Sequence, residues 1–269
     1  MNSHVRRFYR KFIDEDAPIR LYHEVIALHE APRFSWEEIS SKVPSLPKGW
    51  HELAYLQKQD RIEFSRDFWL STVPFEPRFH EFFNQFFSAL DDVGVYVTQL
   101  RFDSPFESEI VYSLRDGSCF FHGSPPCSDE EIAKLKQDFD GLIPEDFCAF
   151  LKIHDGFSKH TDTGLVKTKF LKALYDQLIV ELREDRQDIV CKGKIIDPKS
   201  LIPFYESFGQ PSYQCFFTEW HPGKEVGNVY YSTLEKVISD HTDRNASMEN
   251  LAFPSFLDWL VFYLESIEF

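Results

Sequence analysis

Apolar residues recur at helical spacing over most of the first ninety positions. The pattern predicts helices in residues 5–14, 19–32, 50–69 and 77–90. The last of these segments has a strongly aromatic face, which we expect to lie in the core. Its members are Phe79, Phe82, Phe83, Phe86 and Phe87. The N-terminal part of the chain is therefore predicted to be largely helical.

The pattern changes to strand-like alternation after Gly94. Three short runs between residues 95 and 122 are rich in the β-branched and aromatic residues that strands favour. The dipeptide Asp116-Gly117 is typical of a tight hairpin turn. We therefore expect residues 1–125 to form a helical region that ends in a short β-hairpin.

The segment Gly-Ser-Pro-Pro at residues 123–126 is the best candidate linker, because glycine is flexible and neither proline can join a helix interior. We place a domain boundary there, so that the second domain covers residues 126–269. In this domain, helical patterns alternate with short β-type runs. The helical patterns cover residues 128–139, 144–155, 165–184 and the stretch after 254, and the β-type runs cover 195–204, 212–219 and 227–232. The mixture predicts an α+β fold.

Two capping-box signatures mark expected helix starts. Ser35 is followed by Glu38, and Ser128 by Glu131. At this three-residue spacing, each side chain can bond the backbone N–H of the other residue. The motif says where a helix begins and carries no functional information.

Charge narrows the classes of partner. The chain has 269 residues, with 29 Lys and Arg against 44 Asp and Glu, and a formal net charge of −15. This charge repels phosphate backbones and anionic headgroups, so we expect neither nucleic acid nor a membrane as the partner. Acidity by itself serves solubility, and a basic protein partner is the functional alternative.

Targeting signals and cysteine usage point to the cytoplasm. The N-terminus alternates basic and aromatic residues and has no apolar signal-peptide core. The longest apolar stretch, residues 256–264, contains Asp258 and falls far short of the roughly 20 residues that span a bilayer. The five cysteines are scattered and form no C-x-x-C pair, which suits a reducing compartment. We therefore expect a cytoplasmic protein.

Residues 142–157 read LIPEDFCAFLKIHDGF and resemble the signature helix of the SUKH superfamily. In physical terms, Pro144 sets the first turn, and Asp155-Gly156 closes the helix. One buried stripe between them consists of Phe147, Phe150 and Leu151. The segments LIPF at 201–204 and PSFLDWL at 254–260 continue the resemblance in the order of the family.

The resemblance covers about residues 128–269. It implies an α+β domain with a mostly antiparallel, twisted sheet flanked by helices, and a role in binding proteins rather than in catalysis. Members of the family include bacterial immunity proteins that neutralise toxins and fungal regulators of cell-wall assembly. We therefore expect a non-catalytic protein-binding module, an immunity or regulatory protein without a cofactor. Its partner would be a protein, with a basic toxin or regulator as the favoured class.

Histidine spacing disfavours a metal site. His154 and Asp155, with His160 and Asp162, do not share a helix face. Two His-Glu pairs, His23-Glu24 and His29-Glu30, start six residues apart and lack the H-E-x-x-H spacing of zinc proteases. We expect helix capping and solvated surface at these positions.

The remaining catalytic alternatives rest on weaker signals. Cys148 lies beside Phe147 in the signature helix, where a buried thiol with a raised pKa is expected rather than a nucleophile. No P-loop, G-x-G-x-x-G or G-x-S-x-G motif is present. A hydrolase that uses dispersed carboxylates stays an alternative, because spacing cannot single out a pair among so many acidic residues.

Residues 212–221 alternate large aromatic and polar side chains and are a candidate binding segment. With the end of the preceding strand, the candidate partner-binding residues are Tyr205, Glu206, Tyr213, Glu219 and Trp220. In the purely structural alternative, Phe216 and Trp220 point into the core while Tyr213 and Glu219 cap the sheet. A third hypothesis is a structural adaptor that binds through its N-terminal helices.

Overall fold

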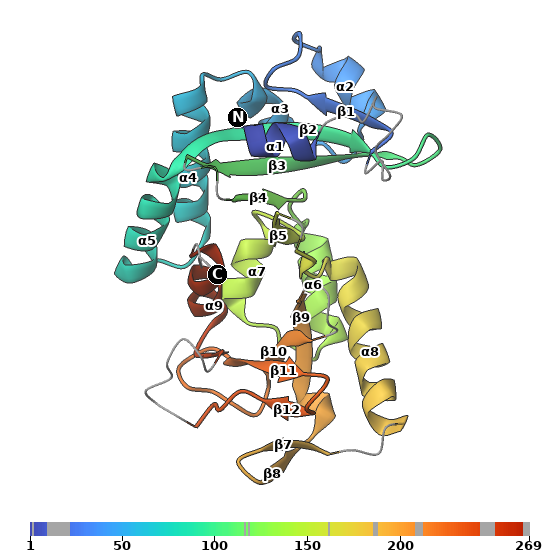
Figure 1. Cartoon of the computed structure of the whole chain (residues 1–269), viewed down its shortest axis with the longest axis vertical. Coiled ribbons are helices and arrows are strands. Elements are labelled where there is room, and N and C mark those ends of the chain that lie inside the picture. The colour runs from blue at the N-terminus through green and yellow to red at the C-terminus, as the bar shows by residue number, and fades with distance from the viewer. Residues whose placement is uncertain are drawn as a thin grey trace. The chain divides into compact units, whose positions relative to one another are not determined.

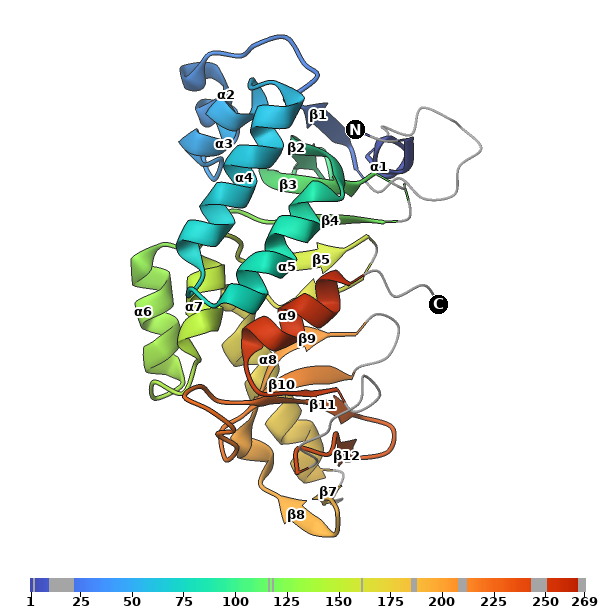
Figure 2. The same ribbon diagram turned by 90° about the vertical axis from the view of Figure 1, so that its left-hand side faces the viewer.

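The computed structural model describes residues 1, 3–9, 22–115, 117, 119–160, 162–184, 188–207, 212–242 and 251–265. Its internal contacts divide the chain into two compact units, Met1–Pro125 and Pro126–Phe269. Figures 1 and 2 show the helices and strands of both. Each unit combines helices with a largely antiparallel sheet, so the predicted α+β class is confirmed. No helix within the described ranges is long and apolar enough to cross a membrane.

In the first unit, four antiparallel strands pair in the order β1-β2-β3-β4. The strands are β1 (Glu24–Ala27), β2 (Leu90–Gln99), β3 (Phe106–Leu114) and β4 (Phe120–Gly123). The helices are α1 (Ser3–Phe8), α2 (Trp36–Lys42), α3 (Lys48–Ala54), α4 (Lys58–Thr72) and α5 (Pro77–Ser88). The sheet is more extensive than the short terminal hairpin expected from the sequence, because β1 joins it from far along the chain.

The helix predicted over residues 19–32 is wrong where the structure describes it. Glu24–Ala27 is strand β1, which pairs with the end of β2. Val25 and Ala27 pack on the same core cluster, so sheet pairing overrides their helical spacing. Residues 19–21 lie outside the described ranges, as do residues 10–14 of the first predicted helix and Asp116 of the predicted turn.

Both faces of the first sheet are covered by helices. Tyr9, after α1, stacks on Tyr96 of β2 with ring centroids 4.1 Å apart. On the other face, Trp69 of α4 donates from Nε1 to the Tyr112 hydroxyl at 3.0 Å. The aromatic face of α5 packs on the same side, and all of its predicted members except the half-buried Phe82 are buried.

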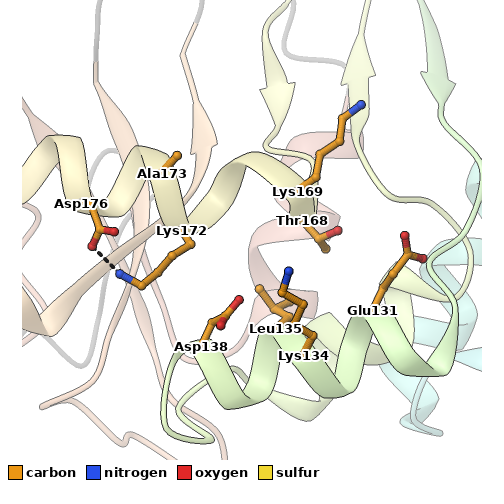
Figure 3. A pocket seen from close by; sticks show the side chains of 9 residues that line it. All are labelled: Glu131, Lys134, Leu135, Asp138, Thr168, Lys169, Lys172, Ala173 and Asp176. Atoms are coloured by element: carbon orange, nitrogen blue, oxygen red, sulfur yellow. Dashed lines mark hydrogen bonds and ion pairs between the residues drawn. The ribbon is translucent and has the colours of Figure 1, made fainter.

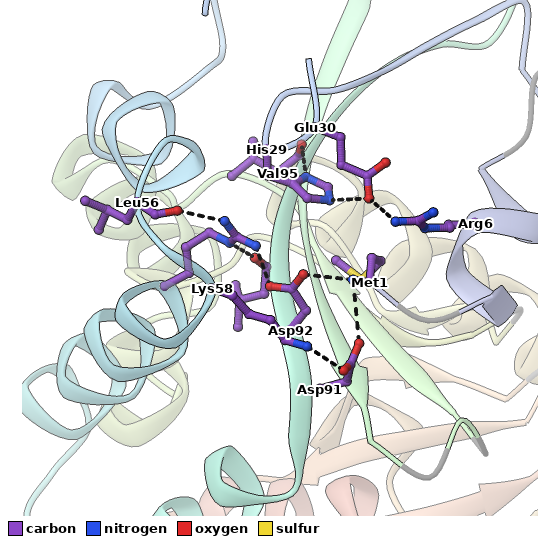
Figure 4. A network of polar contacts seen from close by, with 11 residues as sticks. Met1, Arg6, His29, Glu30, Leu56, Lys58, Asp91, Asp92 and Val95 are labelled. Carbon is purple, nitrogen blue, oxygen red and sulfur yellow. Dashed lines mark hydrogen bonds and ion pairs between the residues drawn. The ribbon is translucent and has the colours of Figure 1, made fainter. Parts of the chain in front are cut away.

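A polar network, shown in Figure 4, fastens α4 to β2. The Arg61 guanidinium donates to Asp92 Oδ1 and to the Val93 carbonyl, each at 2.6 Å, and to the Leu56 carbonyl at 2.8 Å. The Met1 ammonium donates to Asp92 Oδ2 at 2.9 Å. Arg61 and Asp92 are both buried, so each needs the other to compensate its charge.

The second unit is built on a sheet in the order β6-β9-β10-β11-β12-β7-β8, with β13 paired to β11. Its strands are β5 (Phe157–Lys159), β6 (Gly164–Leu165), β7 (Ile189–Cys191), β8 (Lys194–Ile196), β9 (Leu201–Glu206), β10 (Tyr213–Phe217), β11 (Asn228–Ser232), β12 (Val237–Ile238) and β13 (Ala252–Phe253). Its helices are α6 (Asp129–Asp138), α7 (Glu145–Leu151), α8 (Thr168–Glu184), the 3₁₀ turn η1 (Pro198–Ser200) and α9 (Phe256–Leu264). The pairings described within this sheet are antiparallel except that of β12 with β7.

The second sheet separates two apolar layers. Leu178 and Leu182 of α8 pack on one face with Cys215 and Tyr231. Aromatic side chains of α7 and α9 pack on the other face around Phe204, Phe216 and Phe256. Figure 2 shows α8 and α9 on opposite sides of these strands. The sheet therefore holds α8 rigidly, with one flank of the helix turned away from the core.

Candidate functional site

Helix α7 carries the sequence that resembles the SUKH signature. Pro144 is its N-cap, with φ −61° and ψ 145°, one residue before the first helical turn. Phe147, Phe150 and Leu151 are buried, as the pattern predicts. The rings of Phe147 and Phe150 lie 5.0 and 5.5 Å from that of Phe256 in α9. The signature stripe is therefore part of the core and is not available to a partner.

The structure corrects the role predicted for Asp155-Gly156. Helix α7 already ends at Leu151, and the Asp155 carboxylate accepts the Thr168 N–H at 2.7 Å and the Thr168 hydroxyl at 3.1 Å. Gly156 has a φ of +95°, and a Cβ there would lie 2.8 Å from Lys167 Cγ. Asp155 thus caps α8 rather than α7, because free N–H groups at a helix start need an acceptor.

A second aspartate of the signature caps α9. Asp146 Oδ2 accepts the Leu257 N–H at 3.1 Å, and Oδ1 accepts the Phe147 N–H at 2.9 Å. The side chain is 4% exposed, and its burial raises the pKa of the carboxyl to about 6. Sequence reasoning missed this role, because Asp146 and α9 are more than a hundred residues apart.

The helices α6 and α8 enclose an open groove of about 520 Å³, shown in Figure 3. Its lining residues are Glu131, Lys134, Leu135, Asp138, Thr168, Lys169, Lys172, Ala173 and Asp176. Three lysines and three carboxylates are thus among the lining residues, together with Leu135 and Ala173. Lys172 and Asp176 form an ion pair along α8.

Both walls of the groove are fixed at their N-termini. The Ser128 hydroxyl of α6 accepts the Glu131 N–H at 3.2 Å, and the Glu131 carboxylate accepts the Ser128 N–H at 2.8 Å. This capping box, like that of Ser35 and Glu38 in the first unit, is confirmed. Because Asp155 caps the other wall, the groove is bounded by two rigid helices. The sequence indicated both helices but carried no signal that they lie side by side.

The chemistry of the groove is set by its lining residues and by the nearby thiols. Its lining contains no histidine or cysteine. Cys127 lies at one end, where its Sγ is 3.5 Å from the Thr168 hydroxyl, and burial raises the pKa of this thiol to about 12. Burial also raises the pKa of the Cys148 thiol to about 11, as predicted. Both thiols therefore stay protonated at neutral pH.

No metal-ligating group of three or more His, Cys, Asp or Glu occurs within the described ranges. His154, which headed the loose cluster weighed in the sequence, is 1% exposed. Its ring stacks on that of Phe157 with centroids 5.5 Å apart and lies 6.0 Å from that of Phe150. The side chain is packed into the core beside α7.

The five residues predicted to bind a partner do not form one surface. Tyr205 and Glu206 end β9, and Tyr213 begins β10 beside them, whereas Glu219 and Trp220 follow the far end of β10. Tyr213 is buried in the α8 layer, so the alternative in which it caps the sheet is wrong. Glu219 is exposed.

Trp220 is half-buried and has an evident structural role. Its ring lies directly over Gly227, where any Cβ would collide with it, and packs near His241 with centroids 5.6 Å apart. The backbone N–H of Trp220 donates to the Phe217 carbonyl at 2.9 Å. Phe216 is fully buried on the opposite layer. The core alternative is therefore correct for Phe216 and largely so for Trp220.

The sequence of the second unit, which includes the signature helix, matches a known family. The model of the SMI1 / KNR4 family (SUKH-1) matches residues 126–261, which span nearly the whole second unit, including both walls of the groove. A comparison with curated proteins gives no significant match. The chain therefore belongs to the SMI1 / KNR4 family (SUKH-1).

Proposed function

We propose that this chain is a non-catalytic protein-binding module of the SUKH type, an immunity or regulatory protein, which contacts its partner through the groove between α6 and α8. The observation that carries the proposal is the groove itself. It is open, it is bounded by two capped helices, and most of its lining side chains are charged. Preorganised walls of this kind lower the entropy that ordering an interface would otherwise cost.

The distribution of charge supports a basic partner. Residues 126–269 contain 25 Asp and Glu against 15 Lys and Arg, so most of the net charge belongs to the family domain. Opposite net charges accelerate diffusional encounter, and the effect weakens as salt is added. The groove residues then set the register of the bound partner, because lysines and carboxylates at fixed positions favour one arrangement of opposite charges over others.

The state of the side chains supports a binding role over catalysis. The Thr168 hydroxyl, the one hydroxyl among the lining residues, already donates to Asp155 and is used in capping. All five cysteines are buried free thiols, which favours a reducing compartment and makes none of them an exposed nucleophile. No observation on the described residues favours the hydrolase alternative.

Site-specific photo-crosslinking tests the proposal. A photoreactive residue is placed at Ala173 in the groove of the full chain, and at Ala133 as the matched control, which is exposed on α6 but does not line the groove. In lysate of the native host, we expect Ala173 to crosslink one basic protein, less strongly at high salt, and Ala133 to crosslink it poorly.

Charge variants refine the same experiment. Reversal of a groove carboxylate, by Asp138→Lys, should weaken the crosslink to a basic partner, whereas Glu235→Lys at an exposed position outside the groove should not. If the partner crosslinked equally from Ala173 and Ala133, the contact would lie outside the groove and the proposal would be wrong. Capture that does not respond to salt would contradict charge steering.

A further inference from the structure

Helix α4 of the first unit presents aromatic side chains to solvent. Phe64 and Phe68 are one turn apart and 55% and 42% exposed. Phe75, just beyond the helix, is 77% exposed, and Leu56, just before it, is 39% exposed. The helix packs on β2 through a different side, which includes Ile62 and Trp69. Folding of the unit therefore does not require phenylalanine at positions 64 and 68, and such an apolar stripe marks an interaction surface.

Carboxylates border this stripe along one flank. Asp60, Glu63 and Asp67 are exposed and share the outward side of α4 with the two phenylalanines. Among the described residues, Asp60 and Glu63 have no cationic partner within ion-pair distance. Glu63 instead accepts a hydrogen bond from the Gln59 amide at 2.8 Å.

The cations of α4 are already engaged elsewhere. Lys58 binds Asp91 at 2.7 Å, Arg61 binds Asp92 at 2.6 Å, and Arg66 pairs with its neighbour Asp67 at 2.8 Å. The outward side of the helix is thus apolar along its centre and negative along one flank. An occupant must supply both apolar area and positive charge.

We propose that the outward side of α4 is a docking surface for a basic amphipathic helix, whose apolar stripe packs on Phe64 and Phe68 and whose Lys or Arg side chains reach Asp60 and Glu63. Helix-on-helix packing fits a stripe with i, i+4 spacing. An anionic membrane is repelled by the carboxylates. A second copy of this chain that docked through the same side of α4 would bring the same carboxylates. The inference is independent of the groove between α6 and α8.

Binding of designed peptides to the full chain tests this surface. The probe is a fluorescently labelled peptide of about four helical turns, with a leucine stripe flanked by lysines. The control peptide carries glutamates in place of the lysines. Fluorescence anisotropy should show saturable binding of the lysine peptide and none of the glutamate peptide. The double variant Asp60→Asn, Glu63→Gln should reduce the salt dependence of the Kd.

Aromatic variants locate the site. Phe64→Ser and Phe68→Ser should each raise the Kd at least about tenfold, the size of a hot-spot loss. The matched control is Phe102→Ser, at a side chain that is 81% exposed between β2 and β3 of the same unit, and it should leave the Kd unchanged. Unchanged melting temperatures show that the variants fold. The proposal is overturned if the lysine peptide does not bind saturably, if both peptides bind equally, or if Phe102→Ser weakens binding as much as Phe64→Ser.

Discussion

The buried carboxyl of Asp146 makes the stability of the second unit depend on pH. Its pKa rises from 3.8 to about 6 in the folded state, because burial raises the pKa more than the hydrogen bonds from backbone N–H groups lower it. Between these two values the folded state holds the proton more tightly than the unfolded chain does. This contribution to stability is therefore complete below pH 3.8 and is lost as the pH rises through about 6.

The size of the effect follows from the pKa shift. A shift of about two units corresponds to about 3 kcal/mol in the free energy of unfolding. Asn cannot ionise, so Asp146→Asn removes this component while keeping a side chain of the same shape. The stability of the variant relative to the natural protein should rise by about 2–3 kcal/mol between pH 4 and pH 7, because the unfolded carboxyl is already more than half ionised at pH 4.

Urea unfolding measures this difference. Midpoints and slopes are followed by tryptophan fluorescence at several pH values for the natural protein, for Asp146→Asn and for the control Glu130→Gln, whose side chain is exposed on α6. The control should follow the natural protein at every pH. A relative stability of Asp146→Asn that falls with rising pH would refute the reasoning, since it would mean that the N–H donors outweigh burial.

Two further substitutions test local geometry. Gly156→Ala should lower the free energy of unfolding by about 1–3 kcal/mol, because the φ of +95° at this position and the nearby Lys167 side chain both disfavour a Cβ. The control Gly223→Ala, where a Cβ would lie in open space, should change the free energy of unfolding by less than about 0.5 kcal/mol. Equal effects of the two variants in urea unfolding would contradict the argument. Trp220→Ala should lower the melting temperature by several degrees, because it removes the ring packed over Gly227. An unchanged melting temperature together with lost partner capture would restore Trp220 as a binding residue.

Local signals in the sequence were sufficient for several elements. The capping box of Ser128 and Glu131 correctly marks the start of α6, because its two hydrogen bonds involve residues three positions apart. The phenylalanine pattern correctly identifies the buried face of α5, because helical geometry alone brings Phe79, Phe83 and Phe86 together. In both cases the decisive interaction lies within a few residues.

Other predictions failed where distant partners decide the outcome. Residues 24–27 have helical spacing, yet they form a strand because β2 offers an edge with matching backbone groups. Asp155 follows α7 closely enough to suggest a C-terminal cap, yet its carboxylate caps α8, which begins thirteen residues later. The groove residues likewise belong to two helices whose adjacency no local pattern records.

The sequence by itself determined the family, the acidic charge and most helix positions, since these depend on composition and short-range spacing. Tertiary structure alone decided how these parts are used. It buried the signature helix in the core, turned Asp146 and Asp155 into caps for other helices, and brought α6 and α8 together as the walls of a groove. The physical reason is that burial, capping by distant carboxylates and surface shape depend on contacts between residues far apart in the chain.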